Sequence, residues 1–148
     1  MGKATHLETA FARRVRVKPI AAKHNLRNQQ RVDVSADILI ERADGSRLDC
    51  KIANLSRSGV MISCSQDTAR TLLPGLVPPA PGQSLEVTTR FSVPVLATQP
   101  VAVVAEGNIV HMRRVARDEF HLGIRFCEFE GNGFDYVDRY VAKLLARN

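Results

Sequence analysis

Apolar and polar residues alternate with a period of two along most of the chain. The segment Val32–Ile40, for example, has an apolar residue at every second position, which is typical of a strand with one buried and one exposed face. The same alternation recurs in Leu48–Ile52, Val60–Cys64, Leu85–Phe91, Val101–Arg114 and Leu122–Cys127. Six such strands predict a mostly β fold, a small closed antiparallel barrel, because closure leaves no unpaired strand edge.

Turn and helix signals separate and follow these strands. Residues 43–46, with the sequence Ala-Asp-Gly-Ser, predict a tight turn, and the proline-rich segment Pro74–Gly82 predicts a surface loop. Residues 68–73 predict one helical turn, and Gly107 predicts a bulge in the fifth strand. Apolar residues at helical spacing from Phe134 to Leu145 predict a C-terminal helix that packs on the barrel mouth or on another chain.

The net charge of +6 is concentrated near the N-terminus. Seven basic residues and no acidic residue lie between Thr9 and Val32, whereas the other 14 basic residues are balanced by 15 acidic ones. Such a segment is either a solvated arm or the partner of an anion: a nucleotide, a nucleic acid, a membrane surface or an acidic protein. A capping box and helical spacing predict a short helix that ends at about Val17. We therefore divide the chain into a basic N-terminal segment and connector, residues 1–26, and a barrel domain with its C-terminal helix, residues 27–148.

Several classes of protein are disfavoured by what the sequence lacks. No apolar run approaches the roughly 20 residues that cross a bilayer, and the N-terminus has no signal-peptide core, so we expect a cytoplasmic protein. Cys50, Cys64 and Cys127 are far apart among apolar residues, which predicts buried reduced thiols, with a redox or metal role as the alternative. The chain has no nucleophile elbow, phosphate-binding glycine loop or dinucleotide fingerprint. We expect no enzyme, no metal and no cofactor other than a bound ligand.

The candidate binding site consists of two short clusters that bracket the first predicted hairpin. Arg27 and Arg31 precede it, and Asn54, Ser56 and Gly59 follow its second strand. A guanidinium can clamp a phosphate, pair with the O6/N7 edge of guanine or stack on its face. An asparagine carbonyl can accept from the guanine edge, and a serine hydroxyl can donate or accept. A glycine lets a turn adopt positive φ or approach a ligand closely.

These clusters resemble the two-part signature of PilZ domains, which are bacterial receptors for cyclic diguanylate (cyclic di-GMP). The segments Arg27-Asn-Gln-Gln-Arg31 and Asn54-Leu-Ser56-Arg-Ser-Gly59 are similar to the family's Arg-x-x-x-Arg and Asp/Asn-x-Ser-x-x-Gly motifs. Leu122-Gly-Ile-Arg-Phe126 resembles the family's last strand. The resemblance extends over residues 27–145 and implies a six-stranded PilZ-type barrel with a C-terminal helix.

The resemblance also implies a role for each candidate residue. Arg27 and Arg31 hold phosphates and contact guanines, Asn54 and Ser56 read a guanine edge, and Gly59 shapes the turn. Leu26, which is not arginine, favours one bound ligand over an intercalated dimer. Three further arginines are candidates for guanine stacking: Arg57, Arg113 and Arg125.

The expected function is that of a second-messenger receptor. Binding of cyclic diguanylate is expected to fold the connector onto the barrel and pass the signal to an effector protein in motility, polysaccharide synthesis or other signalling. The chain is expected to be a monomer or homodimer. Two alternatives remain: a PilZ-like interaction module that binds no nucleotide, and a basic barrel that binds nucleic acid.

Overall fold

The computed structural model describes residues 14–16, 29–83, 85–95 and 99–147. Their strands are β1 (Arg14–Arg16), β2 (Val32–Arg42), β3 (Arg47–Leu55), β4 (Gly59–Cys64), β5 (Leu85–Val93), β6 (Val101–Ala116) and β7 (Glu119–Glu130). The helices are α3 (Gln66–Leu72) and α4 (Gly133–Ala146), with a short 3-10 turn at Pro74–Leu76. The sequence thus located all six predicted strands and the C-terminal helix.

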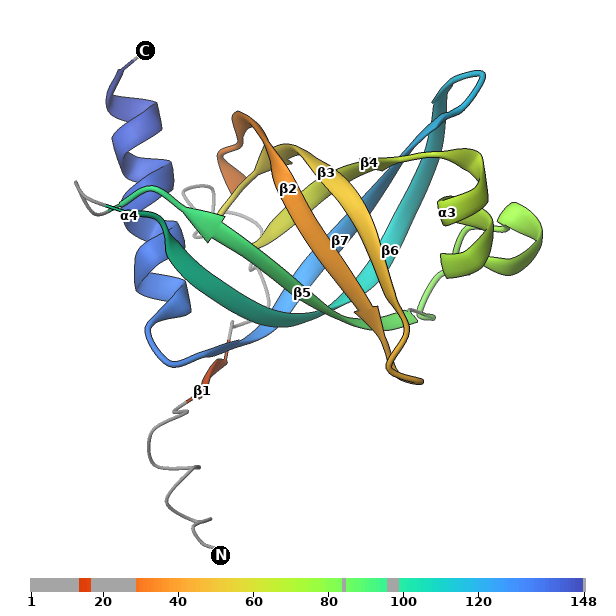
Figure 1. Ribbon diagram of the computed structural model, residues 1–148, viewed down its shortest axis with the longest axis horizontal. Coiled ribbons are helices and arrows are strands. Elements are labelled where there is room, and N and C mark those ends of the chain that lie inside the picture. The colour runs from red at the N-terminus through yellow and green to blue at the C-terminus, as the bar shows by residue number, and fades with distance from the viewer. Residues whose placement is uncertain (1–13, 17–28, 84, 96–98, 148) are drawn as a thin grey trace, which may run out of the picture.

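Six of the strands close into an antiparallel barrel (Figure 1). Each neighbour in the order β7, β4, β3, β2, β5, β6 is hydrogen-bonded to the next, and β6 returns to pair with β7. The predicted mostly β barrel with a C-terminal helix is therefore confirmed. The register between β6 and β7 shifts between Glu106 and Gly107. An irregularity is therefore present at Gly107, but the extra residue is Cys127 on β7, so the bulge predicted in the fifth strand lies on its partner. Helix α4 lies at one end of the barrel and α3 at the other.

The barrel interior holds the alternating apolar residues of every closing strand. Ile40, Leu55, Ile62, Ile109 and Leu122, for example, are fully buried. A line of phenylalanine rings continues this core to the C-terminal helix: Phe91 stacks with Phe126, Phe126 contacts Phe129, and Phe129 meets Phe134 edge to face at a centroid distance of 5.6 Å. Because Phe134 lies in the first turn of α4, this aromatic contact fixes the helix against the barrel.

The N-terminal segment departs from the prediction where the structure describes it. Arg14–Arg16 form a strand, so the helix predicted to continue to about Val17 is wrong at its C-terminal end. This strand pairs antiparallel with the end of β7, with Val15 opposite Phe129. Since β4 pairs only with residues 120–125 of β7, β1 supplies backbone partners to a later stretch of β7. Tertiary pairing outweighs a weak local helix signal here.

Among the helices of the described ranges, none is both long enough and apolar enough to span a bilayer.

Candidate functional site

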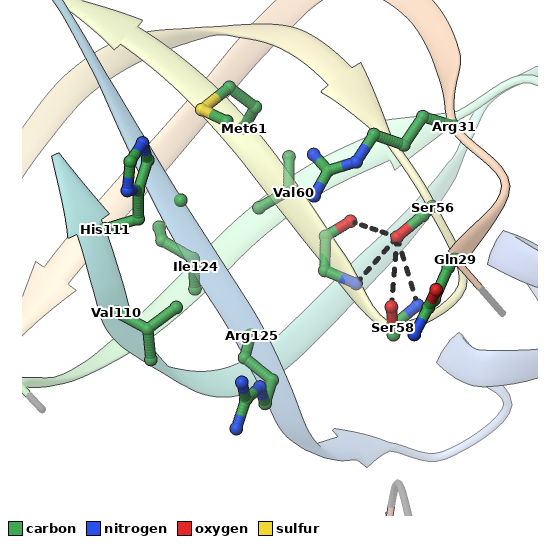
Figure 2. Close-up of a pocket in the computed structure, with 12 residues that line it drawn as sticks. Gln29, Arg31, Ser56, Ser58, Val60, Met61, Val110, His111, Ile124 and Arg125 are labelled. Atoms are coloured by element: carbon green, nitrogen blue, oxygen red, sulfur yellow. Dashed lines mark hydrogen bonds between the residues drawn. The ribbon is translucent and has the colours of Figure 1, made fainter. Parts of the chain in front are cut away.

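The turn between β3 and β4 is built around the hydroxyl of Ser56. The hydroxyl oxygen accepts bonds from the backbone N–H groups of Ser58, at 3.3 Å, and Gly59, at 3.1 Å. The Ser56 N–H donates to the Gly59 carbonyl at 2.9 Å. Figure 2 shows these bonds converging on Ser56. Ser56 is only 3% exposed, so in this structure its hydroxyl shapes the turn.

Gly59 is required by the close approach of β4 to β7, and not by a positive φ. Its Cα lies opposite Arg125, and a Cβ built on it would overlap the carbonyl oxygen of Ile124. The preceding turn is held to the same strand, because the Phe126 N–H donates to the Ser58 carbonyl at 2.9 Å. Contacts with β7 therefore hold this turn in place.

Arg57 points away from the candidate ligand and into the protein. It is 3% exposed, and its Nε donates to the carboxylate of Asp138 on α4. Arg57 does not line the cavity described next, so the suggestion that it stacks on guanine finds no support in its placement. Its position between Ser56 and Ser58 connects the turn to the C-terminal helix.

Arg31 joins the two clusters that bracket the first hairpin. Its guanidinium donates to the side-chain oxygen of Asn54 at 2.9 Å, across 23 residues of sequence. Asn54 lies within β3, opposite Asp33 of β2, and does not follow that strand as expected. The turn comprises only residues 56–58. The acceptor expected to meet guanine is already bonded to Arg31, and only its second lone pair remains available.

A cavity of about 350 Å³ opens beside this contact, on the outer face of the barrel. It lies at the lower end of the volumes that bind small molecules. Two arginines, Arg31 and Arg125, line it, and none of its described lining residues is acidic. The Ser56 and Ser58 side chains border it, as does Gln29 (Figure 2). Its charge suits an anionic ligand.

The predicted site residues are distributed unevenly around this cavity. Its lining includes Arg31, Ser56, Gly59 and Arg125. Asn54 does not line it but is hydrogen-bonded to Arg31, which does. Arg113 lies exposed on β6 and does not line it. Leu26 and Arg27 lie outside the described residues.

Met61 and His111 are among the lining residues that the sequence reasoning missed. Met61 lies on β4 and His111 on β6, and neither belongs to a sequence motif that would single it out as a binding residue. Only the registers of β4, β6 and β7 bring them together, and no local motif carries that information.

A second cavity, of about 720 Å³, contains two of the cysteines. Cys50 on β3 and Cys64 on β4 are buried and both line it. The neighbouring Cys64 thiol raises the pKa of Cys50, and burial raises it further, whereas the Cys50 thiol lowers the pKa of Cys64. Cys127 is only half-buried, contrary to expectation. Among the described residues, no group of three or more histidines, cysteines or carboxylates is arranged to hold a metal.

Comparisons with known proteins agree with this architecture. Among the similar solved structures, the Bacillus subtilis inhibitor of motility MotI/DgrA has a TM-score of 0.63 at 11% identity, over 80% of this chain and 50% of that chain. The PilZ domain of CeSA from a cellulose-synthesizing bacterium has a TM-score of 0.45 at 13% identity, over 80% and 97% of the two chains. The chain thus spans half the length of MotI/DgrA. A search of curated proteins gave no match.

The family model of the PilZ domain matches residues 25–143. This range includes both candidate clusters, all six barrel strands and most of α4. The chain therefore belongs to the PilZ domain family, a family of cyclic diguanylate receptors.

Proposed function

We propose that this chain is a cytoplasmic receptor, and not an enzyme, that binds cyclic diguanylate in the cavity between Arg31 and Arg125. The observation that carries the proposal is the bond from Arg31 to Asn54. It brings the second arginine of one cluster to the first residue of the other, at the edge of a cavity whose described lining residues include no acid. The two clusters thus act on one ligand.

The expected division of labour follows from the chemistry of each group. Arg31 and Arg27 bind the phosphates and contact guanine, since guanidinium groups form paired charge-assisted bonds with phosphate. Asn54 holds Arg31 in place and keeps a lone pair and an amide for the base. Ser56 and Gly59 set the turn that forms the wall of the site. Arg125 supplies a second positive charge from β7.

Binding is expected to act on the basic N-terminal segment. Arg27 and Arg31 directly follow that segment, so neutralising them with a bis-anionic ligand draws the connector onto the barrel. An effector protein then reads the position of the segment. Leu26 in place of an arginine and a cavity of modest volume favour one ligand per chain.

Isothermal titration calorimetry with cyclic diguanylate tests this proposal. We expect wild-type protein to bind with one ligand per chain. Charge-assisted hydrogen bonds contribute roughly 1.5–3 kcal/mol each, so Arg31→Ala is expected to weaken binding about ten- to a hundredfold. Arg27→Ala is expected to have a similar effect. Arg117→Ala, which removes an exposed arginine at the tip of the β6–β7 hairpin, is the matched control and should change nothing.

Three outcomes contradict the proposal. If wild type does not bind the ligand, the chain is a PilZ module that works through protein contacts alone. If short RNA or DNA binds with a steep salt dependence and cyclic diguanylate does not, the basic segment binds nucleic acid. Unchanged affinity in both arginine variants places the ligand elsewhere on the barrel.

A further inference from the structure

A row of residues in register crosses the barrel beside the Arg31 contact. Asp33 on β2 pairs with Asn54 on β3, Asn54 with Met61 on β4, Met61 with Gly123 on β7, and Gly123 with His111 on β6. Residues paired directly across antiparallel strands project from the same face of the sheet. Their side chains therefore form one line on the outer surface.

The centre of this line has no side chain. A Cβ built on Gly123 would lie 3.3 Å from the Cβ of His111 and 3.9 Å from the terminal carbon of Met61. A single methyl group would thus touch both neighbours. Glycine leaves a shallow slot at this point, with an imidazole on one side and a thioether on the other.

The slot belongs to the cavity that Arg31 lines. Met61, Gly123 and His111 all border that cavity, and Figure 2 shows Met61 and His111 near each other at the end away from Ser58. The His111 side chain is exposed. An aromatic ring and a polarizable sulfur both make favourable contacts with flat aromatic groups.

We propose that Met61, Gly123 and His111 form a stacking slot for one guanine of the bound cyclic diguanylate. The proposal rests on the proposed function and adds the part of the ligand that the slot contacts. Gly123 provides the space, His111 covers one part of the base face, and Met61 contacts another. In this arrangement the slot recognises the face of a base, while Arg31 recognises charge and the base edge.

The register also places a positive charge next to the slot. Arg125 lies two residues beyond Gly123 on β7, so it projects from the same face, and it pairs with Gly59 and Asn108. The phosphate of the nucleotide whose base occupies the slot therefore lies towards Arg125 or Arg31. Both cations line the same cavity.

The first test measures affinity for cyclic diguanylate by calorimetry. Stacking of a base on an aromatic side chain is worth about 1–3 kcal/mol by alanine substitution, so His111→Ala is expected to weaken binding roughly five- to a hundredfold. His111→Tyr keeps a flat ring and should retain most of the affinity. His121→Ala is the matched control, because His121 lies on the same strand as Gly123 and bonds Glu119 at 3.1 Å. Its affinity should equal that of wild type.

The second test observes the slot directly. In protein labelled with ¹³C at the methionine methyl groups, the Met61 resonance is assigned by its loss in Met61→Leu. Saturating cyclic diguanylate should shift this resonance upfield, because a methyl group above a purine face experiences its ring current. Gly123→Ala, which fills the slot, should weaken binding and reduce the shift. Should that variant fail to fold, the His111 variants and the Met61 resonance decide.

The outcomes separate the slot from the receptor function. If wild type does not bind the ligand, the proposed function itself fails. If wild type binds and Arg31→Ala binds weakly, the receptor function stands. In that case, unchanged affinity of His111→Ala or an unmoved Met61 resonance overturns the slot.

Discussion

The buried ion pair between Arg57 and Asp138 offers a quantitative test of how the site is held. The Arg57 side chain is 3% exposed and that of Asp138 is 32% exposed. Arg57 lies within the turn that forms the site, and Asp138 lies in α4, 81 positions later. The Asp138→Ala substitution removes one partner and leaves the guanidinium in a buried position.

The magnitude follows from the difference in burial. Removing one member of a fully buried ion pair costs about 3–5 kcal/mol, because the remaining charge stays out of water. Asp138 is one-third exposed, so solvent screens part of the interaction, and both residues have further interactions. We therefore expect the free energy of unfolding to fall by about 2–3 kcal/mol. For a chain of this size the Tm falls by roughly 4–12 °C.

Urea denaturation followed by far-UV circular dichroism measures this change. A double-mutant cycle with Arg57→Met isolates the pair, because distant sites add within about 0.5 kcal/mol. The double variant is expected to lose at least about 1 kcal/mol less than the sum of the two single variants. Asp135→Ala, which removes an exposed acid from the first turn of the same helix, should cost less than about 1 kcal/mol. Additive single effects, or equal losses in Asp135→Ala and Asp138→Ala, refute the reasoning.

Three further predictions concern the barrel itself. Gly59→Ala forces a Cβ onto the Ile124 carbonyl and should lower the urea midpoint by an amount equivalent to about 1–3 kcal/mol; an unchanged midpoint contradicts the close approach of the two strands. Cys50 has its pKa raised above the ordinary 9.0, first by the Cys64 thiol and then by burial. The unfolded chain therefore releases this proton first, so stability should be full below about pH 9 and fall above it by about 1.4 kcal/mol per pH unit relative to Cys50→Ala; parallel pH profiles of the two proteins exclude this. The fully buried Thr89 hydroxyl donates to a backbone carbonyl at 2.9 Å. Thr89→Val should therefore lower the free energy of unfolding, measured by urea denaturation, by about 1 kcal/mol. An unchanged free energy of unfolding would mean that this bond is not maintained in solution.

The fold was predictable because residues of a barrel strand alternate between a buried and an exposed face, and this alternation is visible in the local sequence. Alternation located the strands, and Gly107 marked the position of a register shift between β6 and β7, although the extra residue lies on β7. The helix predicted to end at about Val17 was wrong because a short segment takes its conformation from its partner. That partner is the end of β7.

The candidate site was only partly predictable, since its geometry depends on pairs far apart in sequence. Asn54 was expected to follow the second strand of the hairpin, but pairing with Asp33 and Met61 keeps it in β3. Arg57 was a candidate for guanine stacking, yet it is buried and bonded to Asp138. No local pattern indicates that a residue 81 positions later neutralises it.

The way β7 supports the β3–β4 turn has a consequence for the order in which the chain is synthesised. The signature residues are complete once Gly59 has been made, but the contacts that fix the turn come from Ile124, Phe126 and Asp138. A nascent chain that ends before β7 contains the signature residues but lacks the strand that packs against the β3–β4 turn. The candidate site therefore takes its shape only when the closing strand has been synthesised.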